Sequence, residues 1–105
     1  MDINDIHFHD CRLRRVIEHC DKDDLFFEVD YPVEWECSRF EPRVIAFRDV
    51  LNYRVEEGPF AGAPDILDVR EKGIVGSRRH LEIQTNAGVR SLLCADVELL
   101  SNVTA

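Results

Sequence analysis

His7, His9 and Cys11 alternate near the start of the chain. Alternate side chains of an extended segment share one face, and imidazole nitrogen and thiolate sulfur are both zinc ligands. The spacing differs from the short-turn pairs of structural zinc sites, and a fourth ligand would have to come from elsewhere in the chain. A metal-binding module on this face is one alternative hypothesis. The other interpretation is a terminal segment whose polar residues happen to alternate.

The remaining histidines and cysteines give little support for nucleophilic catalysis. His19 and Cys20 are neighbours in a predicted strand, where they point to opposite faces and cannot form a nucleophile–base pair. His80 matches Cys94 across a predicted hairpin, but reactive thiols need an electropositive setting and this chain is acidic. We therefore predict a buried thiol at Cys94.

Carboxylates are a third source of chemistry. Glu28, Asp30, Glu34 and Glu36 would supply a general acid and base if burial or a like charge raised one pKa. They lie on the polar face of a predicted strand and in the loop after it, which favours a solvated surface. The chain also has no phosphate-binding glycine loop and no nucleophile elbow. We predict no enzymatic activity, no catalytic or metal-binding residue and no cofactor.

Exposed aromatic residues can anchor a protein partner. Trp35 and Phe40 fall in a polar, proline-flanked stretch, and Phe60 falls in a loop rich in glycine and proline. The alternative is that each ring folds back as a lid over the sheet. The His9-Asp10 pair is a further candidate, and its other interpretation is a turn before the first strand. The candidate interaction residues are therefore His9, Asp10, Trp35, Phe40 and Phe60.

Short strands would have to position these side chains. Leu25, Phe27, Val29 and Tyr31 alternate with polar positions, which is the pattern of a half-buried strand that ends at a proline. Residues 49–57 favour a strand over a helix because they are rich in β-branched and aromatic side chains. The other predicted strands span residues 12–20, 43–48, 66–71, 79–85, 89–95 and 96–100, with loops at residues 33–41 and 58–64.

Two hairpins can be given a register. In the first, Leu13 and Ile17 join the face of Leu25, a choice that also turns Arg15 toward that face. In the second, residues 86–88 form a three-residue loop in which the glycine is left-handed. This register sets Thr85 opposite Val89, Ile83 opposite Ser91, Leu81 opposite Leu93 and His80 opposite Cys94.

The fold class follows from this plan. Seven or eight short strands without a long helix predict a mainly β, single domain over residues 1–105, an antiparallel meander forming a sandwich or half-open barrel. Residues 1–10 and 101–105 are expected to be loosely ordered. A half-open sheet has edges to cover, so homodimerisation is compatible with every function considered.

Charge narrows the choice of partner. The net charge is −8, from 13 basic and 21 acidic residues, and such a field repels nucleic acid and anionic membranes but suits a basic protein. The N-terminus lacks the pattern of a signal peptide and no stretch reaches membrane-spanning length, which predicts a cytoplasmic protein with reduced cysteines.

Four segments in order carry a family resemblance: His9-Asp10-Cys11, residues 45–50, residues 65–69 and residues 93–99. Together they resemble a loose group of small bacterial β-rich proteins that open with a His-Asp-Ser or His-Asp-Cys motif. Some of that group are similar to immunity proteins of polymorphic toxin systems. The resemblance implies protein binding without catalysis. The leading hypothesis is an immunity-like or adaptor protein with a basic partner, and the alternatives are a small-ligand-binding domain lined by Phe26, Phe27 or Trp35, and the metal-binding module.

Overall fold

The computed structural model describes residues 3–34, 36 and 38–101. Its elements are the 3-10 helix η1 (Ile3–Asp5) and the strands β1 (Arg12–His19), β2 (Asp24–Glu34), β3 (Arg39–Arg48), β4 (Leu51–Glu57), β5 (Ile66–Val75), β6 (Arg78–Thr85), β7 (Gly88–Cys94) and β8 (Asp96–Leu100). Within these described ranges, no helix is long and apolar enough to cross a membrane.

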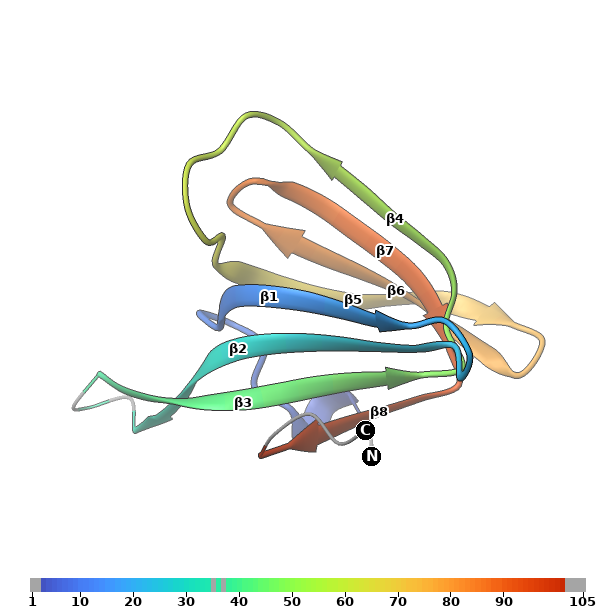
Figure 1. Cartoon of the computed structure of the whole chain (residues 1–105), viewed down its shortest axis with the longest axis horizontal. Coiled ribbons are helices and arrows are strands. Elements are labelled where there is room, and N and C mark those ends of the chain that lie inside the picture. The colour runs from blue at the N-terminus through green and yellow to red at the C-terminus, as the bar shows by residue number, and fades with distance from the viewer. Residues whose placement is uncertain (1–2, 35, 37, 102–105) are drawn as a thin grey trace.

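The strands form two antiparallel sheets. Sheet A has the order β1-β2-β3-β8 and sheet B the order β4-β7-β6-β5. The sheets meet at one end of the molecule and diverge toward the other, so they face each other without closing into a barrel (Figure 1). The predicted mainly β, single-domain sandwich is confirmed, and residues 49–57 are largely a strand as the residue types indicated.

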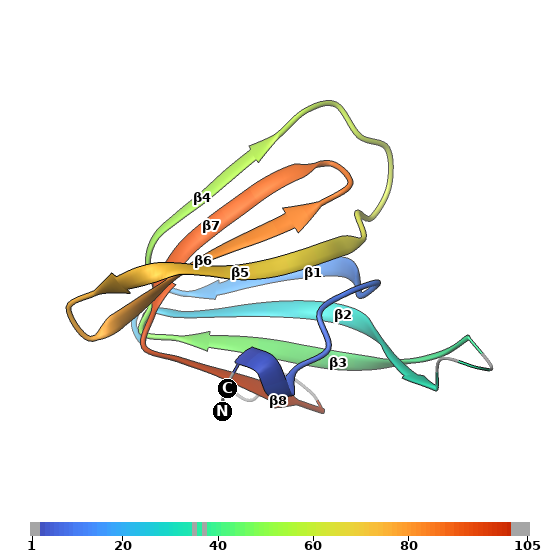
Figure 2. The ribbon, with the colours of Figure 1, turned by 180° about the vertical axis from the view of Figure 1, so that it is seen from behind.

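A bent ribbon joins the two sheets. The chain passes directly from β3 to β4 and from β7 to β8, while β3 pairs with β8 in sheet A and β4 pairs with β7 in sheet B. At the corner the Ala95 amide donates to the Arg48 carbonyl at 2.9 Å, and Asp49 adopts a left-handed φ of 55°. The β3–β8 pair of sheet A therefore continues around the corner as the β4–β7 pair of sheet B. This continuity fixes the two sheets relative to each other (Figure 2).

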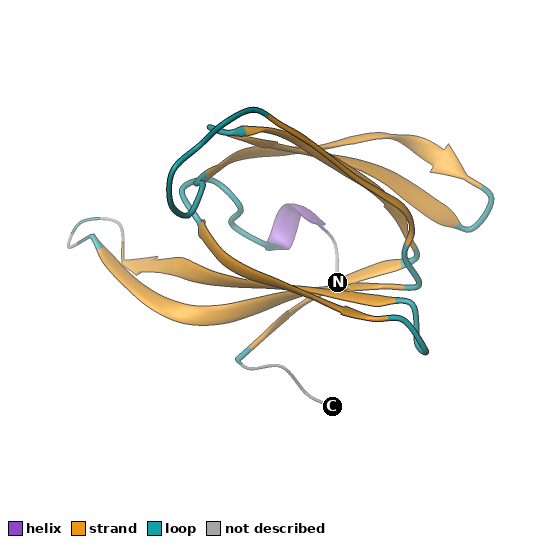
Figure 3. Ribbon diagram, turned by 45° about the horizontal axis from the view of Figure 1, so that its top comes forward, coloured by secondary structure: helices purple, strands orange, loops and turns teal. Residues whose placement is uncertain are grey.

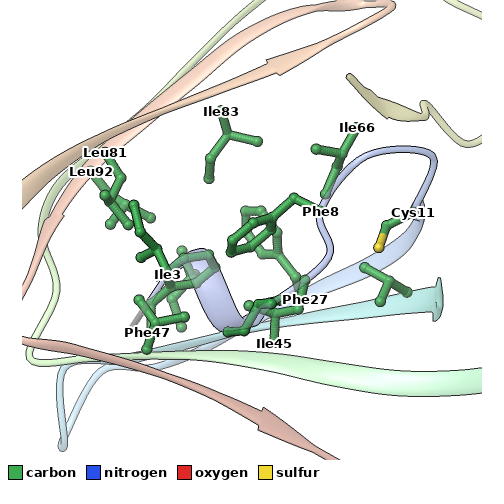
Figure 4. Packing of buried hydrophobic residues seen from close by; sticks show 14 of the residues in the cluster. Ile3, Phe8, Cys11, Phe27, Ile45, Phe47, Ile66, Leu81, Ile83 and Leu92 are labelled. Atoms are coloured by element: carbon green, nitrogen blue, oxygen red, sulfur yellow. The ribbon is translucent and has the colours of Figure 1, made fainter. Parts of the chain in front are cut away.

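The N-terminal segment fills the space between the sheets. Ile3, Ile6 and Phe8 are buried in the main core with side chains of both sheets. Figure 3 shows η1 lying between the strand layers, and Figure 4 shows Ile3 and Phe8 among core side chains from sheets A and B. The expectation that residues 1–10 are loosely ordered is wrong for residues 3–10, because three apolar side chains there find a cavity that neither sheet fills.

A β-bulge corrects the register expected for the first hairpin. The pairing shifts between Leu13, opposite Val29, and Arg15, opposite Glu28. The extra residue reverses the parity of the strand, so Val16 packs against the main core and Ile17 lies on the outer face of sheet A. Placing Ile17 with Leu25 was therefore wrong, and the bulge removes the difficulty of an inward arginine because Arg15 faces out.

The β6–β7 hairpin is tighter than predicted. Only two residues, Asn86 and Ala87, connect the strands, and Gly88 pairs with Thr85 at the start of β7. The register moves by one residue, so His80 is opposite Leu93 and Arg79 is opposite Cys94. Thr85 explains the tight turn, since its hydroxyl oxygen accepts hydrogen bonds from the amides of Ala87 and Gly88, both at 3.1 Å.

Three strands, β2, β3 and β5, are longer than the sequence suggested. β2 continues through Pro32 to Glu34 and pairs with β3 over most of the stretch predicted as a loop at 33–41. The proline is tolerated because the pairing of β2 with β1 ends at Asp30, which leaves that side of β2 without a neighbouring strand. β5 likewise runs through Gly73 to Val75, so both extended hairpins project beyond the body of the molecule (Figure 1).

Candidate functional site

An open groove of about 490 Å³ lies where the β2–β3 hairpin leaves the body of the molecule. We call it the acidic groove. Its lining comes from five segments of the chain and consists of Asp10, Arg12, Arg14, Asp30, Pro32, Glu34, Ser38, Phe40 and Asp65.

A hydrogen-bonded seam brings these segments together. The start of β1 and the residues before β5 are far apart in the sequence, yet the Ile66 amide donates to the Cys11 carbonyl and the Asp10 amide to the Ile66 carbonyl, both at 2.8 Å. The Leu13 amide donates to the Pro64 carbonyl at 2.8 Å. This seam holds Asp10 and Asp65 on one side of the groove, while paired residues of β2 and β3 form the other.

Negative charge dominates the lining. Four carboxylates face two guanidinium groups. Arg12 binds Asp65 at 3.1 Å and Arg14 binds Asp30 at 2.6 Å, which leaves Asp10 beside His9 at 3.2 Å and Glu34 beside Arg39 at 3.5 Å. Exposed ion pairs contribute little net free energy. An incoming cation can therefore replace an existing partner at small cost.

An apolar surface completes the groove. Phe40 is 44% exposed and lies opposite the buried Pro32 in the β2–β3 pairing. A guanidinium or ammonium group can bind a carboxylate while it stacks on an aromatic face. The acidic groove thus has the chemistry to bind basic side chains on an extended segment.

Only some of the predicted interaction residues line the acidic groove. Asp10 and Phe40 line the groove, and His9 is an exposed neighbour of Asp10. Phe60 is equally exposed at 44%, but it lies in the β4–β5 loop outside the groove lining. Trp35 lies outside the described residues. Asp65 was not among the predicted site residues, because only the seam brings it to β1.

The geometry does not bring the three residues of the metal hypothesis onto one strand face. Residues 9 and 10 form a turn, so His7, His9 and Cys11 do not share the face of an extended strand. Cys11 is fully buried, its thiol donates to the His7 carbonyl at 3.1 Å, and burial raises its pKa to about 12. Among the residues that the structure describes, no three His, Cys, Asp or Glu side chains are grouped to hold a metal ion.

The catalytic alternatives also lose their geometric basis. Cys94 is buried and opposite Arg79, not His80, and burial raises the pKa of its thiol to about 11. The hydrogen bond from Arg15 lowers the pKa of Glu28, the opposite of the shift that a general acid needs.

The small-ligand hypothesis required a cavity lined by Phe26, Phe27 or Trp35. Phe26 and Phe27 are both fully buried. Phe27 packs edge-on against Phe47, with ring centroids 5.0 Å apart, and the N-terminal segment occupies the space between the sheets. The two phenylalanines therefore belong to packed clusters.

The fold is similar to that of a protein of known structure. A crystal structure of an uncharacterized protein from Neisseria gonorrhoeae is similar with a TM-score of 0.55 and 10% sequence identity, over 89% of this chain and 92% of that chain. At that identity the likeness concerns the fold alone. No protein-family model and no curated protein matched the chain.

Proposed function

We propose that this chain is a non-catalytic protein-binding domain, an adaptor or immunity-like protein, whose acidic groove takes a basic segment of its partner. The observation that carries the proposal is the combination of four carboxylates with the half-exposed ring of Phe40 in one groove. Burial of an aromatic anchor supplies affinity, and complementary charge selects the partner.

The charge of the whole chain supports the same proposal. A net charge of −8 attracts a basic protein over a distance and raises its association rate at low salt. The two arginines in the groove lining do not reverse this, because each already lies against an aspartate. They hold the carboxylates in place until a partner binds.

Binding of a short arginine-rich peptide tests the proposal directly. Fluorescence anisotropy should show binding that weakens as salt rises, and a glutamate-rich peptide of the same length should not bind. Phe40→Ala should weaken binding about fivefold, which corresponds to about 1 kcal/mol for an exposed cation–π contact. Glu34→Lys should weaken it further at low salt, because it places a like charge in the groove.

Matched controls separate the groove from the rest of the surface. Phe60→Ala removes a ring of the same exposed fraction outside the groove and should leave binding unchanged. Asp21→Lys makes the same change in net charge at the β1–β2 turn and should have a much smaller effect than Glu34→Lys. Equal losses from Phe40→Ala and Phe60→Ala would contradict the groove as the binding site.

The two versions of the proposal differ in what binding does to the partner. For an immunity-like protein, the partner is a basic toxin whose activity falls on stoichiometric addition of this chain. For an adaptor, the partner keeps its activity in the complex. An activity assay of the purified partner, for which the protein encoded beside this one is the first choice, separates them.

A further inference from the structure

The β5–β6 hairpin ends in an unusual tip. Ile74 and Val75 are 72% and 57% exposed, the highest values among the large apolar side chains in the described part of the chain. Successive side chains of a strand point to opposite faces, so Ile74 and Val75 expose apolar surface on both faces of the projecting hairpin end. We call residues 70–79 the hairpin tip.

The hairpin tip is also rich in basic residues. It contains Arg70, Lys72, Arg78 and Arg79 against one acidic residue, Glu71. Arg70 is paired with Asp68 at 3.0 Å and Arg78 with Asp49 at 2.8 Å. Lys72 lies 4.0 Å from Glu82 and Arg79 lies 3.7 Å from Glu71, both too far for a hydrogen bond. These two cations are weakly held by their own chain and can pair with another molecule.

The acidic groove presents the complementary chemistry. Its least tightly held carboxylates are those of Asp10 and Glu34, and its exposed apolar surface is the ring of Phe40. An aliphatic side chain of the tip with cations beside it therefore matches an aromatic ring flanked by anions. An anionic membrane is the less favoured occupant, because the net charge of −8 repels it.

We propose that the hairpin tip of one copy of this chain docks into the acidic groove of a second copy. This inference rests on the proposed function of the groove and names a partner for it. The β5–β6 hairpin and the β2–β3 hairpin, whose residues line the groove, project from opposite ends of the molecule, whose longest dimension is 41 Å (Figures 1 and 2). A copy cannot fill its own groove, so the contact joins different copies head to tail.

The size of a hairpin tip makes this contact weak. Interfaces of this kind fall below the area of stable complexes and form transiently at high concentration. We expect self-association with a dissociation constant below about 1 mM at low salt, and its loss at about 0.5 M salt, where charges are screened beyond a few ångströms. A basic protein partner would compete for the same groove.

Mixing two variants tests the head-to-tail contact. Ile74→Ser/Val75→Ser removes the tip and leaves the groove, while Glu34→Lys disables the groove and leaves the tip. All three side chains are exposed, so both variants should keep the fold, which circular dichroism checks. Sedimentation should find each variant at least tenfold weaker in self-association than the wild type, whereas the mixture forms a one-to-one dimer and nothing larger.

Three outcomes would overturn the inference. The first is a wild type that stays monomeric up to about 1 mM, since any useful contact at cellular concentrations is tighter than this. The second is a mixture that does not associate, because a head-to-tail contact must form between the intact tip of one variant and the intact groove of the other. The third is a tip variant that self-associates like the wild type but no longer floats with vesicles containing phosphatidylserine, which assigns the tip to membranes.

The arginine-rich peptide keeps this inference distinct from the proposed function. The tip variant retains the groove, so it should bind the peptide as the wild type does. Peptide binding without self-association overturns the second copy as occupant and leaves the groove as a site for other basic proteins. A wild type that neither binds the peptide nor self-associates overturns the groove itself as a binding site.

Discussion

Sheet A and sheet B bury apolar side chains in different ways. Sheet A carries apolar residues on both faces: its inner face joins the main core, and its outer face carries Phe26, Val44 and Ala46 in a second cluster. Charged side chains cover that cluster, with Arg48 over the Phe26 ring at 5.3 Å and held by Asp24 and Glu98. Sheet B instead combines aliphatic residues on its inner face with an ion pair between Arg90 and Glu57.

This difference predicts which changes should destabilise each sheet most. Sheet A is held by side-chain packing that reaches both faces, so large-to-small substitutions should have the largest effects there. In sheet B the backbones of β4 and β7 approach closely at Gly88. The ion pair between Arg90 and Glu57 lies near the end of the sandwich where the two sheets diverge. The stability of sheet B should respond more to backbone crowding and to pH.

The largest effect is expected from the inner face of sheet A. Phe27→Ala should lower the free energy of unfolding by about 3–5 kcal/mol, because the ring packs against Phe47 and Tyr53 from both sheets and leaves a cavity. Phe26→Ala should cost about 1–2 kcal/mol less, since its charged cover can relax and admit water. Chemical denaturation measures both. Equal losses would show that the outer cluster is as rigid as the core.

Two glycines of sheet B give the next effect. Gly88 and Gly73 have nearly equal φ angles of 152° and 154°, but a Cβ at Gly88 would collide with the Glu56 carbonyl oxygen and lie 2.8 Å from the Glu57 Cα. A Cβ at Gly73 meets nothing within 4 Å. Gly88→Ala should therefore destabilise the fold by about 1–3 kcal/mol more than Gly73→Ala. Similar unfolding midpoints for the two variants would contradict the close approach of β4 and β7.

The ion pairs provide the smallest effect. Glu57 receives two hydrogen bonds from Arg90 at 2.8 Å, and these lower its pKa from the usual value near 4.5. Its folded pKa is the lower one, so the pair stabilises the protein above pH 4.5 and that stabilisation is lost as the pH falls through the folded value. Glu57→Gln should cost about 1–3 kcal/mol at neutral pH and flatten the acid limb of the stability curve.

Glu28 in sheet A is the matched comparison for this last prediction. It is bound by Arg15 in the same bidentate way, at 2.6 and 3.0 Å, but both side chains are more exposed. Glu28→Gln should leave the stability unchanged within error, because solvent screens the pair. If it flattened the acid limb as much as Glu57→Gln, burial would not be the deciding factor.

Local pattern predicted the strands well and their extensions poorly. The stretch 49–57 was assigned correctly because residue types favour a strand whatever lies beside it. Pro32 looked like a strand end, yet it is tolerated because β1 no longer flanks β2 there. The bulge after Leu13 depends on two strands at once, so alternation within one strand could not reveal it.

The candidate site was predictable only in part. Asp10 and Phe40 were identified from residue type and local context, and both line the acidic groove. Asp65 was not, because its place depends on hydrogen bonds between segments more than fifty residues apart. In the N-terminal segment, the sequence signal of burial was the set of apolar residues Ile3, Ile6 and Phe8, and not the alternating histidines and cysteine.

The buried N-terminal segment has a consequence for the order of folding. Residues 3–8 are synthesised before the strands that complete their binding site, which include β6 and β7. Contacts between such distant segments slow folding, because the intervening chain must be ordered before they form. We expect the segment to dock late, after the two sheets have met, so that residues 3–8 become protected from hydrogen exchange later than the sheets that follow them in the chain.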